Sequence, residues 1–535
     1  MPSFKLDDKE IPFEAGDTII RAAHRVGVDV PHYCWHPGLS VAANCRMCLV
    51  EVMPPPGRPA MMLDVLAWDE LHQTYVPQKK PKLQPACQQA AADGMVVKSQ
   101  TSEHAVKARS AVQELLLLNH PVDCPICDQA GECRLQDYWL EHQASKKRMK
   151  DEPVHKPKGV VFGPTIVYDA ERCIMCTRCV RVSAELAKDP VLSMRERGNL
   201  NEITVAPGRQ LDHDYTLMTE YVCPVGALTS SDFRFKARVW FLRSARSVCT
   251  GCATGCNSFT DFDPRNQKVY RYRPRENAAV NKYWMCDEGM LDYQRIHQDR
   301  VLEARVQGEG VSDSVALAKA AELLQSAAPQ KTAILLSAQH SNEDNVALLD
   351  LAKALGALQL FYTGKAPGKG DDILMSEDKN PNTAGVLALT GGKAKPFADL
   401  VSAIKEGKVG ALIALGSAIG NPNEASALKD VKSFVALASH DGPIAGSAAV
   451  VLPTSSWAEA DGTFVNRLGL WQESDRAITP QGASRPAYRW VQELAKTLSL
   501  VLPWKKVAEL RAASNKGTEP SAVATPSVAP PTGAQ

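Results

Sequence analysis

The chain has 535 residues, of which 44% are apolar and 23% are charged, an ordinary composition for a globular protein of several domains. Because 61 Lys and Arg residues face 60 Asp and Glu residues, the formal net charge of +1 argues against a nucleic-acid-binding protein. No apolar run approaches the roughly 18 residues of a membrane-spanning helix, and the first ten residues lack the apolar core of a signal peptide. We therefore expect a soluble protein of a reducing cytoplasm, whose membrane association comes through a partner.

Residues 1–100 are predicted to form a small β-rich domain in which short strands flank one helix. The helix is expected to run from Asp17, as its N-cap, to Gly27. Its inner face is expected to carry Ile19, Ile20, Ala23 and Val26. A proline-rich insert over 54–86 interrupts this domain, and we expect it to be an exposed excursion.

A second helix is predicted over about 103–118, where apolar residues recur at helical spacing. Its apolar face is expected to consist of Ala105, Ala108, Val112, Leu115 and Leu116. Residues 121–242 are rich in cysteine and have few long periodic segments. That texture is expected where metal centres replace apolar packing.

From about residue 311 the pattern changes to alternating helices and apolar runs. Helices are predicted over 312–327 and from Ser341 to Gly356, the second with a capping box from Ser341 to Asp344. The apolar runs lie at 333–336, 358–361, 411–415, 434–437 and 449–452. This alternation predicts an α/β layer with a parallel sheet. Residues 512–535, rich in Ala, Ser, Thr, Pro and Gly, are predicted to be a disordered tail.

The cysteines are the most informative residues. All 15 lie between Cys34 and Cys286. An odd, clustered set in a long chain without a signal peptide is a poor disulfide framework. Metal or iron–sulfur binding is therefore the better interpretation.

The first group of cysteines falls inside the β-rich domain. It consists of Cys34, Cys45, Cys48 and Cys87. Four thiolates from one small β domain suit a [2Fe–2S] cluster, although the first gap is longer than the plant-type spacing. A Cys₄ zinc site is the alternative, but zinc sites usually use two short pairs and only one pair here is short.

The second group follows the second predicted helix and includes a histidine. It consists of His120, Cys124, Cys127 and Cys133. A lone histidine at a helix end is usually a polar terminus, and a Cys₃His zinc site is a second alternative. We expect a [4Fe–4S] cluster with one imidazole ligand. A neutral imidazole in place of a thiolate should raise the reduction potential.

The third and fourth groups each combine three close cysteines with one distant cysteine. The third consists of Cys173, Cys176, Cys179 and Cys223, the last followed by Pro224 as in bacterial ferredoxins. Arg172, Arg178 and Arg181 crowd it and should favour the more negative, reduced state. The fourth consists of Cys249, Cys252, Cys256 and Cys286. Both groups predict [4Fe–4S] clusters.

Fifteen cysteines and one histidine complete four sites of four ligands, and no cysteine is left over. The chain has no Gly-x-Gly-x-x-Gly and no Walker A motif. The glycines at 364, 368, 370, 416 and 420 lack nucleotide-binding spacing and are expected in loops. Four one-electron centres without a substrate-transforming site indicate an electron conduit.

These motifs, in this order, resemble the large iron–sulfur subunit of the peripheral arm of respiratory complex I, the bacterial G subunit of NADH–quinone oxidoreductase. The stretch 44–52, Asn-Cys-Arg-Met-Cys-Leu-Val-Glu-Val, is similar to that family's [2Fe–2S] loop, and Cys87 to its last ligand. The stretches 119–128 and 131–133 are similar to its His-Cys₃ motif. The resemblance covers roughly residues 3–300.

Residues 300–511 resemble a shortened molybdopterin-oxidoreductase α/β domain, with 457–466 similar to a segment of that superfamily. The resemblance implies no molybdopterin, because this domain is generally vestigial in the family. The resemblance implies an α+β fold of several domains. Residues 1–100 would form a β-grasp [2Fe–2S] domain, and residues 101–143 would form the His-Cys₃ segment. A ferredoxin-like domain over 144–242 and a molybdopterin-oxidoreductase-type [4Fe–4S] domain over 243–299 follow.

The resemblance implies an electron-transfer subunit of a proton-pumping NADH–quinone oxidoreductase at the cytoplasmic face of the inner membrane. Its partners would be the flavin subunit, which binds NADH, and other peripheral-arm subunits. Two departures matter: the 54–86 insert is longer than usual, and the fourth site occurs in only some members, away from the main electron path.

Three alternatives stay open. The electron-input part of an NAD-linked hydrogenase would need further cysteines after Cys286, where there are none. A formate dehydrogenase subunit would need a longer pterin domain and a metal-ligating residue. A zinc-stabilised scaffold would be colourless, whereas iron–sulfur clusters would make the protein brown.

Overall fold

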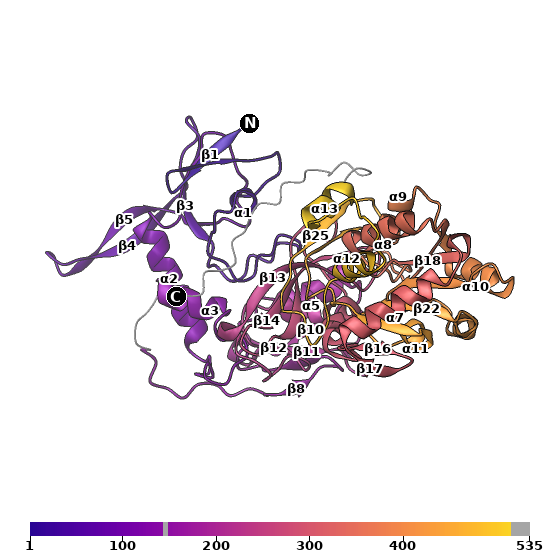
Figure 1. Ribbon diagram of the computed structural model, residues 1–535. Helices are drawn as coiled ribbons and strands as arrows, with labels where there is room; N and C mark the ends of the chain where they lie inside the picture. Colours follow the sequence, from indigo (N-terminus) through magenta and orange to yellow (C-terminus); the bar gives the residue numbers. More distant parts are fainter. Residues whose placement is uncertain (143–147, 515–535) are drawn as a thin grey trace. The chain divides into compact units, whose positions relative to one another are not determined.

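The computed structural model describes residues 1–142 and 148–514, so most of the predicted tail, 515–535, lies outside the described residues. The described chain forms two compact units, an N-terminal unit ending at Trp240 and a C-terminal unit beginning at Phe241 (Figure 1). No helix in the described ranges combines the length and apolar character needed to cross a bilayer.

The N-terminal unit begins with the predicted β-rich domain, a five-stranded mixed sheet in the order β2-β1-β7-β3-β6. The strands are β1 Ser3–Leu6, β2 Lys9–Pro12, β3 Leu49–Met53, β6 Gln84–Pro85 and β7 Val96–Lys98. Strands β1 and β7 are parallel, and the other pairs are antiparallel. Alternate apolar side chains such as Phe4, Leu6 and Val97 pack against helix α1, Ile19–Arg25.

Helix α1 differs from its prediction at both ends. Thr18 is its N-cap, and Asp17 instead accepts hydrogen bonds from the Glu14 amide, at 2.8 Å, and from Arg25, at 2.8 Å. Ile19, Ile20 and Ala23 are buried as expected, but Val26, just beyond the helix, is 42% exposed. The helix is therefore shorter than the apolar pattern indicates.

The 54–86 insert contains an antiparallel hairpin of β4, Met62–Asp69, and β5, Thr74–Pro81. Most residues of both strands are exposed, which confirms the expected excursion, and Figure 1 shows the hairpin as a long arm. The hairpin itself was not predicted. Pro77 and Pro81 in β5 weaken its outer edge for further strand pairing.

Helix α2, Glu103–Leu117, lies where the sequence predicts it, with Ser102 as N-cap, but it buries a different face. Leu115 is 67% exposed, whereas Arg109 and Gln113 are completely buried. The Arg109 guanidinium donates to the carbonyls of Leu49, at 3.2 Å, and Ser99, at 2.8 Å. Hydrogen bonds to backbone, which no apolar pattern reveals, therefore decide the inner face of α2.

The rest of the N-terminal unit consists of short elements, as the cysteine-rich texture predicts. They include α3 Arg134–His142, α4 Arg178–Arg181, a π-helical turn Val182–Leu186, and α5 Leu217–Tyr221. One small sheet joins β8 Val160–Val161, β9 Ile166–Tyr168 and β12 Leu228–Ser230, and a hairpin joins β10 Leu192–Arg195 and β11 Glu202–Val205.

The C-terminal unit begins with a three-stranded antiparallel sheet of β13 Arg243–Val248, β14 Asn257–Asp263 and β15 Lys268–Pro274, followed by α6 Asp287–Leu291. The hairpin of β24, Gly462–Val465, and β25, Trp471–Ser474, lies beside β13. Arg246 binds Asp475 across this contact at 2.7 Å. Residues far apart in the sequence therefore form one body.

The predicted α/β layer is an eight-stranded sheet in the order β17-β16-β23-β22-β21-β18-β19-β20. Its six parallel strands, taken from β20 to β23, follow the order 3-2-1-4-5-6 of doubly wound folds. They are β18 Thr332–Ser337, β19 Gln359–Thr363, β20 Lys395–Pro396, β21 Ala411–Leu415, β22 Ser433–Ala438 and β23 Val450–Pro453. The antiparallel edge strands are β16 Ala304–Val306 and β17 Glu309–Val311.

Helices cover both faces of this sheet, because alternate strand residues point to opposite sides. In β18, Ile334 and Leu336 join one core, and Ala333 and Leu335 join the other. The first core includes α7 Asp313–Gln325, α8 Asn342–Leu355, α9 Thr383–Thr390, α12 Ala487–Thr497 and α13 Val507–Ser514. The second includes α10 Phe397–Lys405 and α11 Pro443–Ser447.

The boundaries of α8 confirm the predicted capping signals. The Ser341 hydroxyl accepts a hydrogen bond from the Asp344 amide, at 3.2 Å. Gly356 ends the helix with φ +71°, a left-handed conformation that glycine adopts without steric cost. Gly416 similarly turns the chain directly after β21, with φ +86°.

We predict that replacing the buried Arg109 by Met destabilises the packing of α2 on the β-rich domain by about 2–3 kcal/mol, because buried carbonyl acceptors lose their donor. Hydrogen exchange at the amides of 49–53 and 96–101 measures this. Lys107→Met is the matched control, since Lys107 is exposed and pairs with exposed Glu103. Equal exchange protection in the two variants would show that Arg109 is dispensable.

Candidate metal centres

The first cysteine group, here the Cys34 site, lies in loops of the β-rich domain. The antiparallel pairing of Leu49 in β3 with Pro85 in β6 places Cys48 beside Cys87. These two side chains are hydrogen-bond partners, as are those of Cys34 and Cys45. The Tyr33 amide also donates to the Cys45 sulfur, at 3.5 Å. The fold thus brings all four predicted residues together.

Sulfur atoms of the Cys34 site are held away from water. Cys34, Cys48 and Cys87 are buried, and Cys45 is half-buried. The hydrogen bond to Cys87, together with burial, raises the pKa of Cys48 well above its usual range. The hydrogen bond with Cys45 and the nearby Arg181 lower the pKa of Cys34 to about 5, although burial opposes this. Hydrogen bonds to sulfur, with a smaller contribution from Arg181, therefore favour the anion at Cys34.

The second group, here the His120 site, brings its three cysteines into electrostatic contact with one another. One guanidinium holds their loop, because Arg238 donates to the carbonyls of Cys127, at 2.9 Å, and Cys124, at 3.1 Å. Burial and the nearby Arg172 lower the pKa of His120 to about 4. Its imidazole is therefore neutral at pH 7, which is the form that binds metals.

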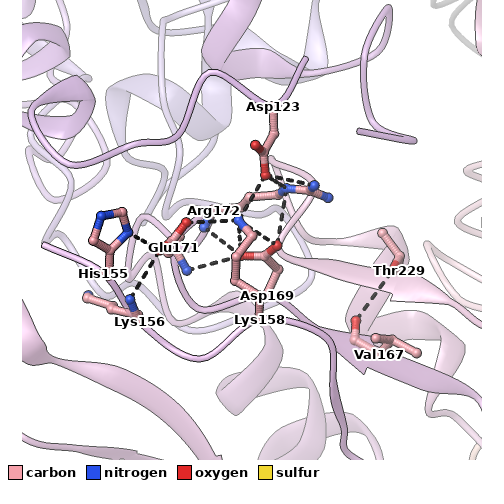
Figure 2. A network of polar contacts seen from close by, with 9 residues as sticks. All are labelled: Asp123, His155, Lys156, Lys158, Val167, Asp169, Glu171, Arg172 and Thr229. Atoms are coloured by element: carbon pink, nitrogen blue, oxygen red, sulfur yellow. Dashed lines mark hydrogen bonds and ion pairs between the residues drawn. The ribbon is translucent and has the colours of Figure 1, made fainter. Parts of the chain in front are cut away.

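A network of ion pairs joins the His120 site to the next group (Figure 2). Asp123, next to Cys124, accepts two hydrogen bonds from Arg172, at 2.9 and 3.0 Å, and Arg172 is next to Cys173. Lys158 reaches the same Asp123 oxygen, at 2.9 Å, and also Asp169, at 3.1 Å. Arg172 and Asp169 are both buried, so this pairing is not a screened surface contact.

The third group, here the Cys173 site, surrounds one cavity. Cys173, Cys176, Cys179 and Cys223 all line it, together with apolar side chains such as Ile203 and Leu228. Burial is the main cause that raises the pKa of each of these thiols. The loop winds tightly, with positive φ at Met175 and Thr177, and the Met175 amide points at the Cys173 sulfur, at 3.4 Å.

The fourth group, here the Cys249 site, lies inside the C-terminal unit. Its four cysteines line one cavity with Met285, Leu374, Met375 and Lys379. The amides of Gly251 and Gly289 donate to the sulfurs of Cys249 and Cys286, each at 3.4 Å. The Ala253 amide donates to the Asp378 carbonyl, at 2.8 Å, so the site is tied to the α/β layer.

Glycines give the sulfur atoms their room. A Cβ on Gly226 would lie 2.2 Å from the Cys127 sulfur, and one on Gly289 would lie 3.1 Å from the Cys249 sulfur. Gly226 follows Cys223, so the loop of the Cys173 site presses on a sulfur of the His120 site. A side chain at position 226 would collide with this sulfur, and one at position 289 would need its neighbours to shift.

An unmatched positive charge also indicates an anionic group. Arg178 is buried, and its Nε atom has no hydrogen-bond partner in the described structure. Its guanidinium donates to the carbonyls of Trp35, at 2.5 Å, and Val222, at 3.1 Å, and it interacts with Cys176, Cys223 and Cys45. Buried charges are normally balanced, so Arg178 fits a site that carries negative charge.

Within residues 1–142 and 148–514, no group of three or more His, Cys, Asp or Glu side chains could hold a single metal ion. In the Cys173 and Cys249 sites the four cysteines instead line one small cavity each. Four cysteine sulfurs around one cavity are the donor set of an iron–sulfur cluster and also of a structural zinc ion. The donor set and its surroundings therefore fit iron–sulfur clusters.

A larger cavity, of about 280 Å³, has no cysteine in its lining. It lies at the carboxyl ends of the parallel strands, where doubly wound folds bind ligands, and Ser417, Ser439 and Ser456 line it. Acidic and basic side chains both face it, among them Arg295 and Asp441. The sequence gives no signal for this cavity.

Several residues around the cysteines escaped sequence reasoning. Arg238 lies more than 100 residues from the loop it holds, and Lys379 and Met375 are about 90 residues beyond Cys286. Gly226 offered a weak signal, because it follows Cys223-Pro224 in the same loop. The others carry no motif, and only the fold brings them to the sites.

Four family models match the chain in succession. They are a 2Fe-2S iron-sulfur cluster binding domain over residues 2–102 and an NADH-ubiquinone oxidoreductase-G iron-sulfur binding region over 109–148. A ferredoxin-like domain of NADH-quinone oxidoreductase subunit 3 follows over 163–229, and a molybdopterin oxidoreductase domain over 352–497. The predicted fold class is confirmed by these matches.

Curated relatives carry matching names. The NADH-quinone oxidoreductase G subunit of Streptomyces coelicolor is 37% identical over 55% of this chain and 32% of its own length. The mitochondrial NADH dehydrogenase [ubiquinone] iron-sulfur protein 1 of Solanum tuberosum is 33% identical over 71% of this chain and 48% of its own length. The chain thus spans about a third to a half of the length of these relatives.

Among solved structures, an NAD+-reducing [NiFe]-hydrogenase in the H2-reduced state is 28% identical, covering 44% of this chain and 91% of its own, with a TM-score of 0.36. The sequence matches are the informative ones. Three iron–sulfur binding regions match in the same order in which the cysteine groups stand. These regions and relatives make the chain similar, over its iron–sulfur part, to the NADH-quinone oxidoreductase G subunit.

Proposed function

We propose that this chain carries electrons within a proton-pumping NADH–quinone oxidoreductase of a respiratory chain and transforms no substrate itself. The observation that carries the proposal is the arrangement of the cysteines: all 15 fall into four groups, in a chain whose iron–sulfur regions match that family. NADH and flavin belong to a neighbouring subunit in this proposal, and quinone to another.

The ligands are assigned group by group. The Cys34 site holds a [2Fe–2S] cluster on Cys34, Cys45, Cys48 and Cys87. Three [4Fe–4S] clusters are held by the His120 site (His120, Cys124, Cys127 and Cys133), the Cys173 site (Cys173, Cys176, Cys179 and Cys223) and the Cys249 site (Cys249, Cys252, Cys256 and Cys286). No molybdopterin is assigned to the 352–497 domain.

When bound, the clusters supply one-electron oxidation and reduction. The chain's own residues bind them, exclude water and set their electrostatic surroundings. Apolar walls such as Ile203 and Leu228 keep the Cys173 site dry, which strengthens every electrostatic interaction there. Amide donors such as those of Gly251 and Gly289 point at sulfur and stabilise negative charge on it.

The location and partners follow from the proposed complex. The chain lies on the cytoplasmic side of the inner membrane and is attached through other peripheral-arm subunits. The His120 and Cys173 clusters carry electrons onward, and the [2Fe–2S] cluster lies near the flavin. The Cys249 cluster, buried within the C-terminal unit, has a structural role.

The fully loaded chain is predicted to contain about 14 iron atoms with matching acid-labile sulfide. Anaerobic iron and sulfide assays on the purified full chain measure this. Dithionite should reduce the clusters, whereas NADH should not, because no nucleotide motif is present. Zinc near four equivalents with little sulfide would contradict the cluster assignment. Rapid reduction by NADH without the flavin subunit would contradict the division of roles.

His120 is predicted to bind its cluster as a neutral imidazole. His120→Cys should retain a [4Fe–4S] cluster with a more negative potential, because a thiolate adds negative charge, and His120→Ala should weaken or lose it. An EPR-monitored redox titration measures both. His104→Ala is the control, because His104 lies in helix α2 outside the four groups. Unchanged spectra and potentials in both His120 variants would remove His120 from the ligands.

Cys286→Ser is predicted to lower stability more than turnover. Cys286 caps α6 by accepting a hydrogen bond from the Gly289 amide, and a serine hydroxyl can keep this cap. The loss of stability should come from the lost cluster, because metal binding contributes to folding. The purified complex should retain near-normal NADH–quinone turnover per flavin but inactivate at a lower temperature.

Cys223→Ser is the matched comparison, because it removes a ligand from the Cys173 site, on the proposed electron path. Turnover should collapse in that variant. If Cys286→Ser lowers turnover equally in complexes that keep their other three clusters, the Cys249 cluster belongs on the path.

A further inference from the structure

Two arginines of helix α4 stand between the Cys34 site and the Cys173 site. Arg181 donates through Nη2 to the Cys34 carbonyl, at 2.5 Å, and to the Cys176 carbonyl, at 3.3 Å. Its Nη1 atom donates to the Ser40 carbonyl. One guanidinium therefore contacts the backbone of a predicted ligand from each of two sites, 142 positions apart in sequence.

The charge of Arg181 is not balanced by a carboxylate. In the described part of the chain neither Arg181 nor Arg178 forms an ion pair, and their acceptors are backbone carbonyls. Arg172, which opens the same loop, is different, because Asp123 and Asp169 neutralise it. Arg172, whose charge is neutralised, therefore faces the His120 site. Arg178 and Arg181, which form no ion pair in the described residues, lie nearer the Cys34 site.

The Arg181 guanidinium places its positive charge beside the backbone of both sites, at Cys34 and at Cys176. Reduction adds one negative charge to a cluster, and a cation nearby stabilises that charge. The same guanidinium therefore stabilises the reduced state on either side.

We propose that Arg181 is a positioning residue shared by two redox centres: its fork ties the Cys34 loop to the Cys176 loop, and its charge raises the reduction potentials of both clusters. The proposal rests on the cluster assignments above and goes beyond them, because it makes the two potentials depend on one side chain. A lysine would keep the charge but would lose the planar fork that reaches several acceptors at once.

The choice of Arg181 over Arg178 follows from burial. Arg178 is 9% exposed and donates to the Trp35 and Val222 carbonyls. Its replacement would destabilise the fold, which would obscure any effect on the reduction potentials. Arg181 is half-buried, so a shorter polar side chain fits there with water in the remaining space.

The test is an EPR-monitored redox titration of the full chain, anaerobically loaded, as wild type, Arg181→Gln and Arg181→Lys. Both the [2Fe–2S] cluster and the Cys173 cluster should shift to more negative potentials, with a larger shift in Gln than in Lys. The His120 cluster should not shift. Arg209→Gln is the matched control, because it removes the same charge from an exposed pair with Asp189 and should leave all potentials unchanged.

A shift confined to one of the two clusters, equal shifts in Arg209→Gln, or no shift in Arg181→Lys and Arg181→Gln would overturn the proposal. If Arg181→Gln loses a cluster, the potentials of Arg181→Lys are compared with wild type instead, because lysine retains the charge and most of the length of the side chain. The proposed function fails separately: a wild-type chain without iron and without EPR signals would contradict the cluster assignments before any variant is compared.

Discussion

The need to keep sulfur anions in dry surroundings constrains most of this structure. Burial raises the pKa of nearly every cysteine in the Cys173 and Cys249 sites, so the apo chain disfavours the very thiolates that its cluster sites require. Positive charge is what resolves this conflict, from iron within each site and from arginines outside it. The guanidinium of Arg178, buried without a carboxylate beside Cys176 and Cys223, suits such anions.

Sequence reasoning proposes the ligands because most members of each group lie close together in the chain. The distant ligands are delivered by the fold: the pairing of β3 with β6 brings Cys87 to Cys48, and the start of α6 brings Cys286 to its partners. The parallel sheet was equally predictable, since its strands are apolar on both faces. The inner face of α2 was not, because Arg109 and Gln113 are buried through hydrogen bonds to distant backbone.

The residues that hold the cysteine loops and line the cavities could not be predicted from the sequence, because they too reach the sites through tertiary packing. Arg238 holds the Cys124–Cys127 loop, and Lys379 lines the Cys249 cavity next to Glu288. Such residues belong to no motif, and their partners lie roughly a hundred positions away. A local pattern identifies which residues bind, whereas tertiary packing decides how strongly each site favours an added electron.

The close approach of Gly226 to the Cys127 sulfur has a consequence for the speed of electron exchange. Backbone of the Cys173 loop lies against a sulfur of the neighbouring group, and the Arg172–Asp123 pair holds the same two loops from another direction. Neither loop can move without the other, so little atomic rearrangement can accompany a change of charge. On the proposed electron path, this coupling and the apolar lining of the Cys173 site would keep the reorganisation energy of transfer between the two centres small.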